Sequence, residues 1–210
     1  MTNPNRAHLT LIIDRSGSMQ AVRNEAQDGI NSLLADQFAL DVDLTVTLVE
    51  FDHRVETVAR MADSVPGYEL RPRGNTRLLD AVGLEIVRTG EDLAALPQDA
   101  RPARVLFVVV TDGFENASTE YSIGQVREAV DHQRTVYSWQ FQFIGADESA
   151  WQGNQMGMAS MRYPNSPMGT GAAFQLASAA ICNFLVADPI FAKLKMAAEI
   201  DEDGNVVSPR

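Results

Sequence analysis

Val105-Leu-Phe-Val-Val-Val-Thr-Asp-Gly113 is the stretch of sequence that decides the fold. Its first six residues are apolar without interruption, and four of them are valine. A short unbroken run of this kind is typical of a central parallel strand that helices cover on both faces. The polar residues Thr111-Asp112-Gly113 end the strand, so a carboxylate stands at its carboxyl end. We therefore expect a buried, mostly parallel sheet and search outward for its other strands.

The residues before this strand alternate between strand and helix patterns. His8–Asp14 is apolar and β-branched toward its end, which predicts a second buried strand, and a helical spacing of apolar residues starts near Gln20. Apolar residues with a period of two over Val42–Phe51 predict a third strand. Val55–Met61 is a weaker strand pattern, and the short turn before it would let this segment pair antiparallel with the third strand.

The rest of the chain continues the alternation. The spacing of apolar residues predicts helices over 76–96, 123–132 and 172–187, a short helix near Trp151, and a strand over 137–144. Alternating strands and helices indicate an α/β fold with right-handed crossovers. The sequence therefore predicts a doubly wound, Rossmann-like, mostly parallel sheet with one antiparallel edge strand and helices on both faces.

Two glutamines do not fit an inner strand of such a sheet. Gln140 and Gln142 alternate with aromatic residues in the segment 137–144. A buried amide needs hydrogen-bond partners. Either this strand lies nearer the edge of the sheet, or a polar network lies beneath a helix, and the sequence leaves both explanations open.

Length, charge and cysteine content narrow the functional classes. The chain has 210 residues, which suits one large domain, with 45% hydrophobic and 21% charged residues. Seventeen Lys and Arg against 28 Asp and Glu give a net charge of −11, which argues against nucleic acid or an anionic membrane surface as a partner. The single cysteine, Cys182, excludes a disulfide framework and a cysteine-based zinc site.

The two ends of the chain lead to three further expectations. Met1–Leu9 contains no apolar run of signal-peptide length, and no stretch approaches ~18 consecutive apolar residues, so we expect a cytoplasmic protein without a membrane segment. Residues 1–187 are expected to form the domain and residues 188–210 an acidic tail that is flexible or binds a partner. Asp201–Asn205 resembles the start of a calcium loop but lacks the later glutamate, so we expect a solvated turn.

Three of the expected loops carry oxygen ligands at the carboxyl ends of strands, where ligands bind in sheets of this class. Asp14, Ser16 and Ser18 follow the first strand, Thr76 precedes a helix, and Asp112 ends the central strand. Three hydroxyls and two carboxylates, without imidazole or thiolate, suit a hard cation: Mg²⁺, with Mn²⁺ or Ca²⁺ as alternatives. Only two formal negative charges face this cation, so an acidic residue of another molecule could complete the site.

These motifs resemble the metal-ion-dependent adhesion site (MIDAS) of the von Willebrand factor A (VWA) domain family. The likeness consists of Asp14-x-Ser16-x-Ser18 after the first strand, Thr76 before a helix, and Thr-Asp112-Gly after a later strand. The three segments occur in the order and at the structural positions that the family shows. The resemblance extends over most of the chain, from residue 8 to about residue 187.

The resemblance implies roles for the five residues. Ser16 and Ser18 would ligate the ion directly, Thr76 directly or through water according to conformational state, and Asp14 and Asp112 directly or through water. It also implies a stand-alone intracellular module for protein–protein interaction, whose partner supplies an acidic residue. A chaperone-type ATPase or an assembly component is the kind of partner that the family suggests.

The main alternative is an enzyme. A Mg²⁺-dependent phosphoryl-transfer hydrolase of the dehalogenase type also places an aspartate after its first strand, and Asp14 would then be the nucleophile. Its general acid normally stands two residues later, where this chain has Ser16, and the only lysines are Lys193 and Lys195, near the C-terminus. The chain also lacks the GxGxxG and GxxxxGK[ST] motifs of nucleotide-binding loops. We therefore expect no catalytic activity.

Several further polar residues lie near the motifs in the sequence. Asp80 and Glu115 are either outer partners of the metal site or solvated acids. Asn116 and Ser118 are expected to fix their own loop through backbone hydrogen bonds. The two serines of the first loop could instead be helix N-caps, although the other three residues argue against it. His8 has no second ligand at metal-binding spacing and is expected to be structural.

Overall fold

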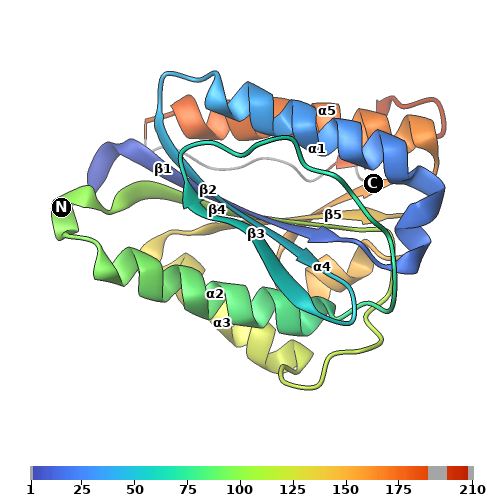
Figure 1. Ribbon diagram of the computed structural model, residues 1–210, viewed down its shortest axis with the longest axis horizontal. Helices are drawn as coiled ribbons and strands as arrows, with labels where there is room; N and C mark the ends of the chain where they lie inside the picture. Colours follow the sequence, from blue (N-terminus) through green and yellow to red (C-terminus); the bar gives the residue numbers. More distant parts are fainter. Residues whose placement is uncertain (1, 189–197, 208–210) are drawn as a thin grey trace.

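The computed structural model describes residues 2–188 and 198–207. Strands in this part of the chain form one sheet with the order β3-β2-β1-β4-β5-β6-β7-β8. Helices α1 and α5 cover one face of the sheet and α2 and α3 cover the other (Figure 1). The strands are β1 (Asn3–Asp14), β2 (Asp43–Phe51), β3 (Val55–Ala62), β4 (Pro102–Thr111), β5 (Gln140–Ala146), β6 (Ala159–Tyr163), β7 (Ala198–Ile200) and β8 (Val206–Val207). The helices are α1 (Arg23–Phe38), α2 (Leu78–Ala95), α3 (Ile123–Tyr137), α4 (Trp151–Gln155) and α5 (Pro167–Val186), with 3₁₀ turns at Gly17–Val22 and Gln98–Ala100.

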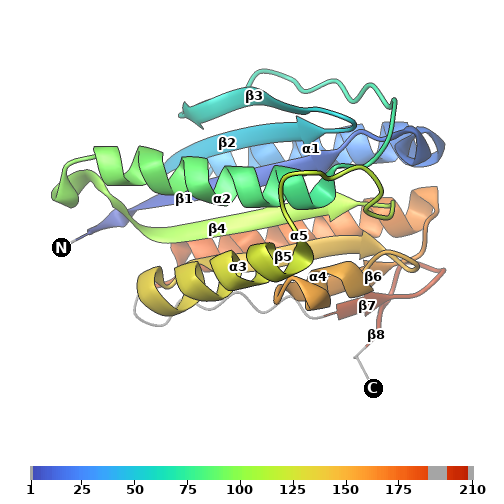
Figure 2. The same ribbon diagram turned by 90° about the horizontal axis from the view of Figure 1, so that it is seen from below.

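Strand pairing confirms the mostly parallel, doubly wound sheet. β1 lies parallel to both β2 and β4, and parallel pairing continues from β4 through β5 and β6 to β7. β3 pairs antiparallel with β2, as predicted. At the opposite edge β8 also pairs antiparallel, with β7, and the sequence did not indicate this second antiparallel strand. Because β1 and β4 are parallel neighbours, the loops that follow them lie side by side (Figure 2).

Two apolar layers join the helices to the sheet. Leu9, Leu11 and Ile13 of β1 belong to the layer beneath α1 and α5, whereas Ile12 belongs to the layer beneath α2 and α3. Both faces of β1 and β4 are therefore buried, which explains their nearly unbroken apolar sequences.

Helix α5 is long and apolar enough, by length and composition, to cross a membrane, with a mean hydropathy of 1.3. Half of that apolar window is buried inside the molecule. The helix lies against α1, and a Cβ added to Gly29 of α1 would lie 2.5 Å from the ring of Phe174. This burial is what a core helix shows, and a core helix meets the same length and composition criteria as a membrane span.

The strand with the two glutamines is not at the edge of the sheet. β5 lies between β4 and β6, and the short, mixed sequence of β6 gave no strand signal. Gln142 is fully buried, and its Nε2 donates a hydrogen bond to the carbonyl of Phe143 at 3.0 Å. Gln140 at the start of β5 donates to the carbonyl of Ser138 at 3.2 Å. The edge explanation is therefore wrong.

The sheet continues beyond residue 187. β7 and β8 lie in the segment that was expected to be a tail, so the predicted division at residue 187 does not mark the end of the sheet. Residues 189–197 and 208–210 of that segment lie outside the described residues. Between β7 and β8, Oδ1 of Asp201 accepts hydrogen bonds from the backbone N–H groups of Asp203 and Asn205, so this segment is a turn, as predicted.

His8 should make the fold sensitive to acid. It is fully buried between hydroxyls of Thr10 and Thr45, and burial, with Arg60 adding to the effect, lowers its pKa to about 3. Below pH 6.5 the unfolded chain binds a proton that the folded chain refuses, so stability falls as the pH drops from 6.5 towards 3. When the pH is lowered from 7 to 5, the free energy of unfolding of the parent protein should fall by about 2 kcal/mol more than that of His8→Gln.

Urea denaturation at the two pH values measures this difference. His132→Gln is the matched control, because His132 is exposed and should change neither value. Equal pH dependence in His8→Gln and the parent would contradict the prediction.

Candidate metal site

The loop after β1 is fixed by the carboxylate that precedes it. Asp14 is fully buried; its Oδ1 accepts a hydrogen bond from the backbone N–H of Ser16 at 2.6 Å, and its Oδ2 accepts one from the hydroxyl of Thr111 at 2.5 Å. The N-cap residue of α1 is Val22, and Ser16, which precedes the 3₁₀ turn, makes no capping hydrogen bond with its side chain. Neither serine is therefore held as a helix cap, and both hydroxyls remain available to the site.

A chain of hydroxyls joins the first loop to the third. The Oγ atoms of Ser16 and Ser18 are 3.1 Å apart, and the Oγ of Ser18 donates to Oδ1 of Asp112 at 2.6 Å. The other oxygen of Asp112, Oδ2, is buried and has no hydrogen-bond partner among the described residues.

Gly113 marks the point where the three loops converge. A Cβ placed on this glycine would lie 3.2 Å from the Oγ of Ser18, 3.3 Å from the Oγ1 of Thr76 and 3.5 Å from Oδ2 of Asp14. The glycine thus leaves open a space that oxygen atoms from all three loops border, and any side chain at this position would enter it. The structure brings together the five residues that the sequence predicted, Asp14, Ser16, Ser18, Thr76 and Asp112.

Backbone hydrogen bonds attach the second loop to the first. The N–H of Arg73 donates to the carbonyl of Arg15 at 2.7 Å, and the N–H of Gly17 donates to the carbonyl of Gly74 at 3.2 Å. Gly74 has a φ of +70°, a conformation that favours glycine. These contacts bring Thr76 to the loop that follows β1.

Asn116 holds Thr76 from the other side. Its Oδ1 accepts a hydrogen bond from the backbone N–H of Thr76 at 2.9 Å, and the N–H groups of Asn116 and Ala117 both donate to the carbonyl of Thr76. The expectation that Asn116 fixes its own loop is therefore wrong, because its side chain bonds to the loop of Thr76. This residue joins the second loop to the third, and no local sequence signal distinguishes it from an ordinary loop asparagine.

Asp80 and Glu115 are neither solvated acids nor free ligands. Asp80 is buried and accepts hydrogen bonds from three consecutive backbone N–H groups of residues 119–121 and from the guanidinium of Arg77. Glu115 accepts from the N–H of Leu79 at the start of α2 and from backbone and hydroxyl groups of its own loop, including Ser118. Both acids fasten the β4–α3 loop to the first turn of α2, so their role is to position the third loop.

Gln152 of α4 is a further support that the sequence did not reveal. Its Nε2 donates to the carbonyl of Gly113 at 2.9 Å, and its Oε1 accepts from the N–H of Glu115 at 2.8 Å. The amide therefore holds the backbone on both sides of Phe114. Its partners lie 37 and 39 residues away in the sequence, so only the fold shows the connection.

Arg15 lies between Asp14 and Ser16 in the sequence, but its side chain turns away from the candidate site. Its buried guanidinium donates to Glu50, Asp52 and Glu56 of β2, the β2–β3 turn and β3. Asp52 is fully buried and also accepts from Arg73 at 2.7 Å. Although burial acts in the opposite direction, the hydrogen bonds from Arg73 and Arg54 and the charge of Arg15 lower the pKa of Asp52, so it is ionised.

The electrostatics of the site favour a cation. Burial raises the pKa of Asp14 to about 6, against the hydrogen bonds from Thr111 and Ser16, and burial also raises the pKa of Asp112. Arg15, which follows Asp14 in the sequence, pairs with Glu50, Asp52 and Glu56. Among the described residues, no basic side chain pairs with Asp14 or Asp112. No group of three or more His, Cys, Asp or Glu with metal-binding geometry occurs in residues 2–188 and 198–207. The donor set is instead rich in hydroxyls, and with the unpartnered Oδ2 of Asp112 it fits a hard divalent cation.

The geometry does not support a nucleophilic role for Asp14. Both of its oxygens accept hydrogen bonds, and its side chain is fully buried. The described residues contain no lysine, and the position of the expected general acid is Ser16.

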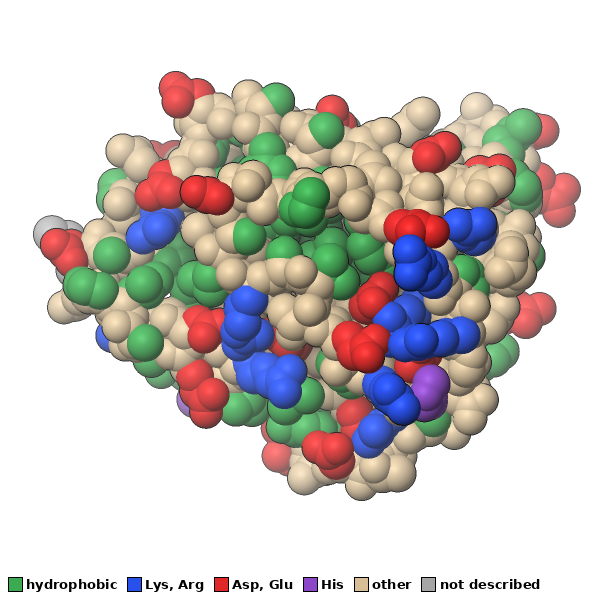
Figure 3. Space-filling model, viewed as in Figure 1, with side chains coloured by type: hydrophobic (Ala, Val, Ile, Leu, Met, Phe, Trp, Pro, Cys, Tyr) green, Lys and Arg blue, Asp and Glu red, His purple; other side chains and the backbone are tan. Residues whose placement is uncertain are grey.

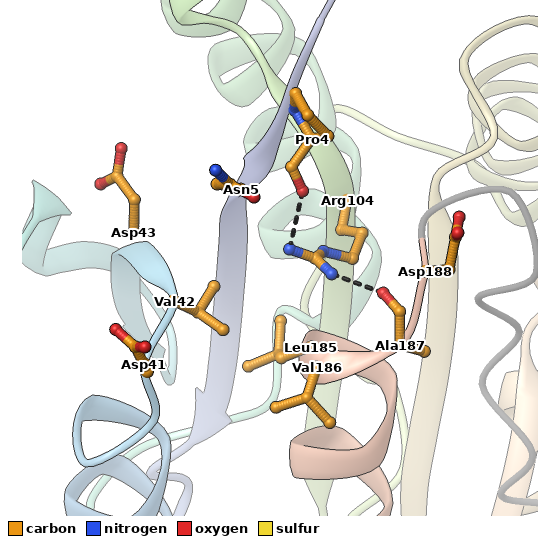
Figure 4. A pocket seen from close by; sticks show the side chains of 10 residues that line it. All are labelled: Pro4, Asn5, Asp41, Val42, Asp43, Arg104, Leu185, Val186, Ala187 and Asp188. Atoms are coloured by element: carbon orange, nitrogen blue, oxygen red, sulfur yellow. Dashed lines mark hydrogen bonds between the residues drawn. The ribbon is translucent and has the colours of Figure 1, made fainter.

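A hollow of about 500 Å³ lies away from the candidate site, where strands β1, β2 and β4 begin (Figure 4). There the buried guanidinium of Arg104 donates to the carbonyls of Ala187 and Pro4, at 2.6 and 3.0 Å. Arg104 thus ties the beginnings of β1 and β4 to the end of α5. Asp41, Asp43 and Asp188 line the same hollow, so its charge disfavours an anionic ligand.

Comparison with known proteins identifies the fold. No protein-family model matches the sequence, and no curated protein matches it significantly. Solved structures do match. Proximal thread matrix protein 1 of the mussel byssus is 13% identical over 84% of this chain and 48% of its own, with a TM-score of 0.63. The von Willebrand factor type A structure from Catenulispora acidiphila is 14% identical over 85% and 43%, with a TM-score of 0.58.

A third match is the D319A mutant of the PilB minor pilin from Streptococcus sanguinis, which is 11% identical over 86% of this chain and 62% of its own, with a TM-score of 0.57. A further structure of the mussel protein has a zinc-occupied MIDAS. The chain therefore has a VWA fold, and it spans between 43% and 62% of the length of these three solved chains.

Proposed function

We propose that this VWA fold is a divalent-cation-dependent module for protein–protein interaction, with no catalytic activity. Asp14, Ser16, Ser18, Thr76 and Asp112 hold the cation, directly or through water, and an acidic residue of a protein partner completes its coordination. The observation that carries the proposal is the convergence of oxygen atoms from three loops beside Gly113, next to a buried carboxylate oxygen without a partner. Mg²⁺ is the proposed ion, because these ligands are hard oxygens, and Mn²⁺ and Ca²⁺ are alternatives.

The solved neighbours support a protein partner. They include a minor pilin, a pilus tip protein and a pilus adhesin. For the present chain we propose a protein partner in the cytoplasm, either an assembly component or a chaperone-type ATPase. The chain's own residues would hold the cation rigidly, since the supporting hydrogen bonds to Asp14, Thr76 and Gly113 already fix all three loops. The bound cation would supply positive charge to an incoming carboxylate.

The net charge of −11 would repel an acidic partner at long range. The distribution of charge near the site reduces this repulsion. Basic side chains gather with acidic ones towards the end of the molecule at which β1 ends (Figure 3). Arginines and carboxylates are close to balance there, with Arg15, Arg23, Arg71 and Arg73 paired to Glu50, Asp52, Glu56 and Glu69. An acidic segment can therefore approach this end without the repulsion that the whole chain would exert.

Isothermal titration with Mg²⁺ and Mn²⁺ tests the metal site. We expect binding by the parent protein and none by Asp14→Ala or by Ser16→Ala/Ser18→Ala, because each change removes ligands that nothing nearby replaces. Asp63→Ala/Ser64→Ala is the matched control, since both residues are exposed and belong to the loop after β3. Equal binding by parent and site variants would refute the proposal, and Mg²⁺-dependent phosphatase turnover lost in Asp14→Asn would establish the hydrolase instead.

A further inference from the structure

We infer that a groove beside the candidate metal site receives a large apolar side chain of the same partner segment whose acidic residue completes the metal coordination. This inference rests on the proposed function and adds a second requirement for the partner. The groove has a volume of about 330 Å³ and lies between the first turn of α2, the β4–α3 loop and α4. The lining residues used below are Leu79, Phe114, Glu115, Ile123, Trp151 and Gln152.

The groove and the metal site share a wall. Phe114 and Glu115 directly follow Asp112-Gly113, and Leu78, which also lines the groove, stands two residues after Thr76. Gln152 lines the groove and donates a hydrogen bond to the carbonyl of Gly113. A partner side chain that reaches the cation therefore brings its sequence neighbours to the mouth of this groove.

Exposed aromatic side chains form the rim of the groove. Phe114 and Trp151 are 45% and 49% exposed, and their ring centroids are 6.4 Å apart. Ile123 on the same rim is 37% exposed. Half-exposed aromatic rings that lie next to one another are typical of protein interfaces. Trp and Tyr are enriched there and contribute much of the binding energy. Other exposed apolar side chains, such as Val87 of α2 and Val136 of α3, do not line this groove.

The chemistry of the wall selects an uncharged occupant. Glu115 is the only charged lining residue, and both of its oxygens already accept hydrogen bonds from Leu79, Ala117 and Ser118. The amide of Gln152 is likewise used at both ends. The side chains of Glu115 and Gln152 thus have no hydrogen bond left for a polar ligand, and the remaining polar side chain of the lining, Gln155, is exposed to solvent. The volume is at the lower end of ligand pockets, which suits one large side chain. The occupant is therefore Leu, Met, Phe or a residue of similar size beside the partner's Asp or Glu.

Selection from a random-peptide phage library on the immobilised full chain in Mg²⁺ tests this inference. Bound phage are eluted first with EDTA and then with denaturant, and the parent is compared with Phe114→Ser/Trp151→Ser. We expect the EDTA fraction of the parent to show an acidic residue with a large apolar residue at a fixed offset. The groove variant should retain the acidic residue and lose the apolar preference. Val87→Ser/Val136→Ser, which changes two exposed valines outside the groove, is the control.

A synthetic peptide with the selected sequence makes the test quantitative. Replacing its apolar residue by Ser should weaken binding to the parent about tenfold, and binding to the groove variant by less than twofold. An acidic preference without an apolar one overturns the groove inference and leaves the proposed function intact. An empty EDTA fraction, with apolar peptides in the denaturant fraction that depend on Phe114 and Trp151, overturns the proposed function instead. Absence of enrichment in both fractions overturns both.

Discussion

Asp14→Asn should leave the metal-free protein at least as stable as the parent and should abolish the stabilisation by Mg²⁺. The substitution keeps the size of the side chain, and an amide can still accept from the N–H of Ser16 and meet the hydroxyl of Thr111. It removes a fully buried negative charge that lies near Asp112 and has no basic partner. In the parent, Mg²⁺ at about 100 times its dissociation constant should add ~2.7 kcal/mol, which raises the Tm of a chain of this size by about 5–10 °C.

Thermal unfolding in EDTA and in Mg²⁺ measures both effects, and Asp63→Asn is the matched control, because Asp63 is an exposed residue outside the site. The two halves of the prediction can fail separately. If Mg²⁺ raises the Tm of Asp14→Asn as much as that of the parent, Asp14 does not hold the ion. If the variant is less stable than the parent by ~2 kcal/mol or more in EDTA, the buried carboxylate of Asp14 does not destabilise the metal-free protein.

The five proposed ligands were accessible to sequence reasoning because they stand at the ends of regular elements. The apolar runs of β1 and β4 locate their carboxyl ends, and the parallel arrangement then places Asp14 and Asp112 on neighbouring strands. The helical spacing after Thr76 places that residue at the start of α2. Periodicity alone therefore puts the three loops at one end of the sheet, and the residue types within them suggest the ion.

The residues that hold those loops in place were not accessible in the same way. Asn116 and Gln152 act through hydrogen bonds to backbone groups 37 to 40 residues away, and such contacts depend on the path of each loop. No periodic pattern encodes that path.

The missed strands have a different cause. β6, β7 and β8 have five, three and two residues, which is too short for an alternation to stand out. Without β6, a position nearer the edge of the sheet stayed open for the strand that contains Gln142. This edge of the sheet consists of short strands that only the folded structure reveals.

Arg15→Ala should destabilise the protein by about 3 kcal/mol, and so lower the Tm by about 6–12 °C. Arg15 is 4% exposed, and its guanidinium donates to three carboxylates, of which Asp52 is fully buried. Removing it leaves that charge with Arg73 as its remaining guanidinium partner. A buried charge that loses a partner destabilises the fold by more than the ion pair had contributed. Arg15→Lys should recover only part of the loss, because an ammonium cannot present the planar fork that reaches three carboxylates at once.

Urea denaturation measures the loss, and Arg71→Ala is the matched control. Arg71 is exposed, and its one ion pair within the described residues is with the exposed Glu69, so this variant should stay within about 0.5 kcal/mol of the parent. The charge cluster also fixes Arg73, three residues before Thr76, so Arg15→Ala should weaken Mg²⁺ binding although Arg15 contacts no ligand oxygen. A loss of stability below ~1 kcal/mol, with Mg²⁺ affinity unchanged, would show that the second loop is held by its backbone hydrogen bonds to Arg15 and Gly17 and not by the charges beneath it.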